Sequence, residues 1–232
     1  MKPLIFFAVV MGVALMTSCN KYKDEATGAG DALIFSKKIG SETVYGISIY
    51  AYTFSSFKSV QAVSSAEDVT YTLKSNQERK TNFYYVTPDE NLSTTPPVAS
   101  TYNFSAVFEN GATDEFQDVL TSDLLAPATI ENCAYNTTGS KLEITWASLS
   151  GADNFGINIM DGTKVVFSSA IIANTVVTYP ITSSTAGWVT GVTPESGKTY
   201  TVRIYAYLYE SAINSYNIQA SSVAEKTVIW GE

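Results

Sequence analysis

The second half of the chain alternates polar and apolar residues in short stretches. In residues 140–146 (SKLEITW), Leu142, Ile144 and Trp146 recur at every second position, and residues 202–208 repeat this period. A period of two is typical of a strand with one buried face. Two further strands are expected within residues 152–167, on either side of the turn signal Asp161-Gly162. A last strand is expected over residues 222–230, whereas residues 170–186, rich in Thr and Ser, show no clear strand.

The first half shows the same kind of pattern. Strands are expected over residues 31–39, 44–54, 69–73, 83–86 and 102–108. Residues 92–99, with their prolines, are expected to form a loop or an edge, and only residues 115–125 could hold a turn of helix. The pattern predicts an all-β protein with two tandem β-sandwich domains, 31–126 and 127–232. Pro127 fixes its own backbone and restricts Ala126, so residues 124–127 are expected to form a short, semi-rigid hinge.

The first residues predict export. Lys2 precedes an apolar run over residues 4–15, which is too short to span a bilayer. The following Met-Thr-Ser-Cys sequence resembles a lipobox. The resemblance implies a lipoprotein signal peptide over residues 1–18 and acylation of Cys19, which would anchor the protein in a membrane. The alternatives are an ordinary signal peptide with an incidental Cys, or a transmembrane anchor.

Residues 19–30 are polar and contain glycines, and we expect a flexible lipidated tether. Within it, Lys23-Asp24-Glu25 resembles a short signal that sends some lipoproteins of Gram-negative bacteria to the outer face of the outer membrane. We therefore predict a surface-exposed outer-membrane lipoprotein. The alternative is that these three residues are only part of a soluble linker.

A family resemblance is carried by Pro127, Trp146 and residues 192–206 (VTPESGKTYTVRIYA). Together they resemble the fibronectin type III domain. The resemblance implies a seven-stranded sandwich with Trp146 in its core and structural roles for Pro194 and Tyr200. Tyr200 would be the tyrosine corner, whose hydroxyl bonds to upstream backbone. The first half looks immunoglobulin-like in a general sense, without a motif that names its family.

Composition removes several classes of chemistry. The net charge of −8 argues against nucleic acid as a partner. The chain has no His, which is the commonest general base and metal ligand, and most of its adjacent acidic pairs lie beside turn residues. Cys133 is expected to be a small buried hydrophobe. We predict no catalytic residue, no metal and no cofactor.

The candidate binding surface is aromatic. If Val202, Ile204 and Ala206 face the core, the residues between them share the outer face. The same argument applies to the first half, so the candidate residues are Arg203, Tyr205, Tyr207, Tyr209, Tyr50 and Tyr52. Exposed tyrosines suit contact with sugars or proteins. The alternative is that these are ordinary sheet tyrosines covered by loops or by the neighbouring domain.

Three functions remain open at this point. The first is a non-enzymatic surface lipoprotein for binding or adhesion, which presents two sandwich domains to a glycan or a protein and is similar to accessory lipoproteins of starch-utilisation-type systems. The second is a structural pilus subunit of the fimbrillin type, or an assembly component. Such subunits are processed at a basic site, and the chain offers only Arg79 and Arg203. The third is an enzyme whose carboxylates converge in the fold, within about 10 Å of each other.

Overall fold

The computed structural model describes residues 26–76, 79–211 and 214–232. The first half contains seven strands and one short 3-10 helix: β1 (Gly28–Ile39), β2 (Glu42–Thr53), β3 (Phe57–Ser64), β4 (Val69–Asn76), β5 (Arg79–Val86), η1 (Asp89–Asn91), β6 (Ser100–Phe108) and β7 (Thr113–Leu120). The second half contains β8 (Ile130–Asn136), β9 (Lys141–Trp146), β10 (Asn154–Asp161), β11 (Lys164–Ser168), β12 (Ile172–Ala173), β13 (Thr178–Ile181), β14 (Thr199–Ser211) and β15 (Asn214–Ile229). The all-β prediction is confirmed. Among the described residues, no helix is long and apolar enough to cross a membrane.

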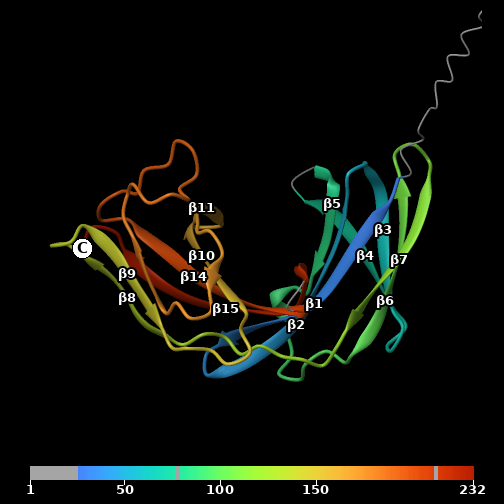
Figure 1. Ribbon diagram of the computed structural model, residues 1–232, viewed down its shortest axis with the longest axis horizontal. Helices are drawn as coiled ribbons and strands as arrows, with labels where there is room; N and C mark the ends of the chain where they lie inside the picture. The colour runs from blue at the N-terminus through green and yellow to red at the C-terminus, as the bar shows by residue number, and fades with distance from the viewer. Residues whose placement is uncertain (1–25, 77–78, 212–213) are drawn as a thin grey trace, which may run out of the picture.

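One long sheet runs through both halves. Its strand order is β11-β10-β14-β15-β1-β2-β5-β4-β3-β6-β7, with β12 paired to β10. The two halves meet where β1 pairs in parallel with β15, from Ile34 beside Ala220 to Lys37 beside Val223. Figure 1 shows the result as an arch, with β1, β2 and β15 at its centre. The halves are therefore joined by sheet hydrogen bonds as well as by the chain.

The first half curls around its own hydrophobic core. Alternate residues of each strand point inward, for example Ile47, Ile49 and Ala51 on β2, and they pack against Phe57, Phe104 and other residues of β3 and β6. The curl brings β7 back beside β1 (Figure 1). There, two carboxylates of β7 accept hydrogen bonds from the free edge of β1: Asp114 from the Gly28 N–H and Asp118 from the Ala32 N–H, each at 2.8 Å. Side chains thus cover this part of the β1 edge.

The second half is a two-layer sandwich. A three-stranded sheet, in the order β13-β9-β8, packs on the part of the long sheet formed by β10, β14 and their neighbours. The inward residues of both layers form a second core, which includes Leu142, Ile144, Phe155 and Ile204. The structure therefore has two cores but one shared sheet. Whether the two halves are separate domains with the predicted boundaries stays a prediction.

Several local predictions were wrong. Residues 115–125 contain no helix, because residues 115–120 belong to strand β7, and the sequence pattern predicts no strand where β3 lies. In residues 170–186 the structure places the short strands β12 and β13. Strand β1 begins at Gly28, inside the segment predicted as tether, and Ala26 is already buried against the first core.

The predicted hinge is tied to both halves. Leu125 and Ala128 are buried in the second core, and the Ser36 hydroxyl of β1 donates a hydrogen bond to the Leu125 carbonyl. This connection therefore packs against its surroundings, which a freely moving linker would not do.

Candidate binding surface

The two hydrophobic cores lie on the same face of the long sheet, which leaves the opposite face open. Ile34 on β1 contacts the first core, and its neighbour across the parallel pairing, Ala220 on β15, contacts the second. Because side chains alternate along a strand, the residues between them point to the other face. This open face lies on the inner side of the arch in Figure 1. It carries the tyrosines that the sequence singles out.

Three of these tyrosines gather at the junction of the halves. The rings of Tyr205 and Tyr207 on β14 are nearly parallel, with their centroids 6.3 Å apart and 5° between their planes. Tyr50, from β2, lies close enough to affect the ionisation of Tyr207. All three are half-buried. Burial first, and then the neighbouring tyrosines, raise the pKa of Tyr207 to about 12, so its hydroxyl stays neutral at physiological pH.

A groove of about 310 Å³ crosses the junction. It is lined from the first half by Tyr50, Ser48, Phe35, Lys37 and Asp89, and from the second half by Arg203, Tyr205, Ser221 and Glu225, among others. Its size falls within the range of small-ligand pockets. Tyr50, Arg203 and Tyr205 were predicted on two separate domains, and the structure places them in one groove.

Two ion pairs border the groove. Arg203 Nε lies 2.7 Å from a carboxylate oxygen of Glu225, and Lys37 Nζ lies 2.7 Å from Asp89 on η1. The pairs come from opposite halves and place charged donors and acceptors beside the tyrosine rings. Such a mixture of flat apolar rings and polar groups can bind a ligand that has both CH faces and hydroxyl groups.

Tyr52, Tyr207 and Tyr209 do not line this groove. Tyr52 lies toward the end of β2 and is 41% exposed. Tyr209 follows an irregularity in the β14–β15 pairing, and its backbone N–H donates to Asp153 at 2.8 Å. Of the six candidate residues, the structure therefore places Tyr50, Arg203 and Tyr205 in the groove. Tyr207 stacks beside Tyr205, Tyr209 lies close enough to affect the ionisation of Tyr207, and Tyr52 lies outside the groove.

The residues predicted to be structural are all buried. Trp146 is 1% exposed and packs edge-on against Phe155 in the second core. Pro194 is buried in the loop before β14. The Tyr200 hydroxyl accepts a hydrogen bond from the upstream Glu195 N–H at 3.1 Å. The buried Pro194 and the hydrogen bond between Glu195 and Tyr200 hold the β13–β14 connection in place.

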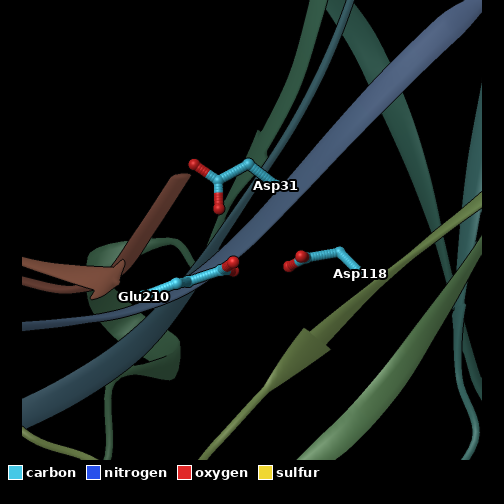
Figure 2. Close-up of side chains that lie close together, drawn as sticks. All are labelled: Asp31, Asp118 and Glu210. Atoms are coloured by element: carbon cyan, nitrogen blue, oxygen red, sulfur yellow. The ribbon is translucent and has the colours of Figure 1, made fainter. Parts of the chain in front are cut away.

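Three carboxylates that the sequence analysis did not single out come together beside the tyrosines. Asp31 on β1, Asp118 on β7 and Glu210 on β14 each offer an oxygen, and these oxygens lie within 4.8 Å of one another. Figure 2 shows the three side chains converging from different strands. Asp31 and Asp118 are 5% and 7% exposed, whereas Glu210 is exposed. No motif could reveal this cluster, because its members are far apart in the sequence and meet only through the β1–β15 pairing and the return of β7.

The cluster shifts the ionisation of its members. Burial is the main cause that raises the pKa of Asp31 from 3.8 to about 7, opposed by a hydrogen bond from the Ile218 N–H and reinforced by Asp118 and Glu210. Burial and Asp118 also raise the pKa of Glu210. The convergence meets the distance condition of the enzyme hypothesis. However, two of the three carboxylates are buried and accept backbone hydrogen bonds, which leaves only Glu210 open to a substrate.

The two cysteines have different positions. Cys19, the predicted lipidation site, lies outside the described residues. Cys133 is buried in the second core, and burial raises the pKa of its thiol to about 11. A thiol with so high a pKa is a poor nucleophile at neutral pH.

In comparisons with known proteins, no protein-family profile and no curated protein sequence matches this chain. Among solved structures, the BSP domain of a biofilm associated protein aligns with 90% of this chain and 53% of its own, at 9% identity and a TM-score of 0.28. A beta-1,2-glucanase from Parabacteroides distasonis aligns with 86% of this chain and 36% of its own, at 12% identity and a TM-score of 0.26. This chain therefore spans about half and about a third of those proteins, and TM-scores this low support no argument about function.

Proposed function

We propose that this protein is a non-enzymatic surface lipoprotein that binds a glycan or a protein in the groove between its halves. The observation that supports it is the groove itself, where Tyr50 of the first half lies on the same open face as Arg203 and Tyr205 of the second. A tyrosine offers a flat apolar ring and one hydroxyl, and it loses little side-chain entropy on binding. In this proposal the lipid on Cys19 holds the protein at the outer membrane, and the second half is a fibronectin type III-like domain.

The tyrosines of the groove favour a saccharide as the first ligand to test. Sugar rings present CH groups on one face and hydroxyls at their edges, and the groove is lined by Tyr50 and Tyr205 beside the Arg203–Glu225 and Lys37–Asp89 pairs. The non-enzymatic part rests on the burial of Asp31 and Asp118 and on the ion pairs that engage Asp89 and Glu225, the two carboxylates of the groove.

A glycan array probed with a soluble chain tests this proposal. The chain should begin at Asn20, because a start at Asp31 would remove Gly28–Gly30 from β1. We expect binding that Tyr205→Ala weakens at least about tenfold, the equivalent of about 1.4 kcal/mol. The matched control is Phe54→Ala, since Phe54 is fully exposed and does not line the groove.

Three outcomes would change the proposal. Equal binding by wild type and Tyr205→Ala, or an equal loss in Phe54→Ala, would remove the groove as the binding site. Failure to bind any glycan would shift the proposal to a protein ligand. Hydrolysis of a bound glycan, abolished by Glu210→Gln, would contradict the non-enzymatic part.

A further inference from the structure

We propose that Asp31, Asp118 and Glu210 bind a calcium ion that ties the β14–β15 hairpin to the first half. The three residues come from β1, β7 and β14, so a shared ion would bridge both halves at the junction. This site is separate from the tyrosine groove: none of the three carboxylates lines it. The proposal therefore stands or falls independently of glycan binding.

The geometry fits a single ion. Calcium binds oxygen ligands at about 2.3–2.6 Å, so two oxygens on one ion lie no more than about 5 Å apart. The three carboxylate oxygens lie within 4.8 Å of one another. A central ion would thus need little movement of the side chains. Calcium also accepts irregular coordination completed by water and carbonyl oxygens, whereas magnesium demands a near-octahedral arrangement.

One oxygen of the cluster is buried without a partner. Asp31 is 5% exposed, and while its Oδ2 accepts from the Ile218 N–H at 3.1 Å, its Oδ1 has no hydrogen-bond partner among the described residues. Figure 2 shows a carboxylate oxygen of Asp31 directed toward Asp118 and Glu210. A buried acceptor without a partner is costly, and a bound cation would satisfy it.

The charges point to a cation as well. Three carboxylates at this spacing repel each other, and no Lys or Arg among the described residues forms an ion pair with any of them. The donors are all hard oxygens, and the chain has no His. This donor set suits calcium, magnesium and manganese, and not the transition metals that prefer nitrogen or sulfur ligands.

Thermal unfolding of the purified full-length chain in a non-ionic detergent tests the site. After treatment with a chelator, calcium chloride at about a hundredfold excess over its dissociation constant should raise the unfolding midpoint by about 5–10 °C. Magnesium chloride at the same concentration should raise it less. No shift with calcium at about pH 8 would overturn the proposal. An unfolding midpoint that rises only when the pH is lowered would also overturn it, because a proton shared between the carboxylates, and not an ion, would then relieve their repulsion.

Matched variants locate the ion. Asp118→Asn and Glu210→Gln each remove one charge and should abolish most of the calcium-dependent shift. The control is Asp114→Asn, because Asp114 lies on the same strand and accepts a hydrogen bond from β1 at the same 2.8 Å, but it is not part of the cluster. Its calcium response should equal that of the wild type. Glu210 is exposed, so Glu210→Gln keeps the test valid even if Asp118→Asn fails to fold. A full calcium response in Glu210→Gln would overturn the proposal.

Discussion

Asp31 shows how one residue can acquire a property that its sequence context does not suggest. Its neighbours in the chain are Gly30 and Ala32, which carry no charge. Its raised pKa comes from burial and from Asp118 and Glu210, which reach it only through the pairing of distant strands. By contrast, the position of Tyr205 opposite Ile204 follows from alternation along one strand and could be predicted from sequence. The local sequence predicts which side chains of a strand share a face. It does not predict which groups of distant strands lie against that face.

The ionisation of Asp31 predicts a pH dependence of stability. Its folded pKa, about 7, is above its ordinary value of 3.8, so between these values the folded state binds more protons than the unfolded state. Stability should therefore fall as the pH rises from about 4 to about 7 and then level off. With a chelator present, the free energy of unfolding should decrease by on the order of 2 kcal/mol between about pH 5 and pH 8.

Urea unfolding at these two pH values, on wild type and Asp31→Asn, measures this effect. Asparagine keeps an oxygen that can accept from the Ile218 N–H but cannot ionise, so the variant should lose much less stability over the same range. An identical pH dependence in both proteins would show that Asp31 does not carry it.

At the scale of elements, regular strands were predictable and irregular ones were not. Strand β9 alternates without interruption, with Leu142, Ile144 and Trp146 all buried. Strand β3 has an irregularity between Phe57 and Ser59, so the buried Phe57 and Val60 are three positions apart in place of two, which hides the period. Strand β7 carries acidic residues that accept hydrogen bonds from the edge of β1, so its sequence pattern resembles that of a polar segment. Both strands depend on partners that the local sequence does not show.

The early start of β1 gives a test at this scale. A Cβ atom on Gly30 would lie 2.6 Å from the Phe104 ring in the first core. Gly30→Ala should therefore lower the free energy of unfolding by about 1–3 kcal/mol. In a flexible tether, as the sequence predicted for residues 19–30, the same substitution would cost nothing.

Gly139→Ala is the control for this substitution. Its nearest contact would be the flexible Lys141 side chain at 3.1 Å, and we expect a change within about 0.5 kcal/mol. Both values can be measured by urea unfolding. Equal stability of Gly30→Ala and the wild type would mean that β1 does not begin before Asp31.

For the whole molecule, the decisive feature is the parallel pairing of β1 with β15. It joins the two halves through residues that are separated by most of the length of the sequence. No local sequence pattern predicts such a contact. The sequence therefore predicted two separate rows of tyrosines on two domains. The pairing turns them into one open face, with both cores behind it and a groove across the junction. The organisation of the molecule, more than any one motif, creates the candidate site.

The most direct test of this shared surface is a double-mutant cycle. The affinity of the wild type, Tyr50→Ala, Tyr205→Ala and the double variant for a glycan from the array would be measured by titration calorimetry. We expect each single substitution to weaken binding about tenfold and the two effects to be coupled by about 0.5–3 kcal/mol, because both tyrosines line one groove. If Tyr50→Ala, folded as stably as the wild type, bound with unchanged affinity while Tyr205→Ala did not, the binding surface would belong to the second half alone.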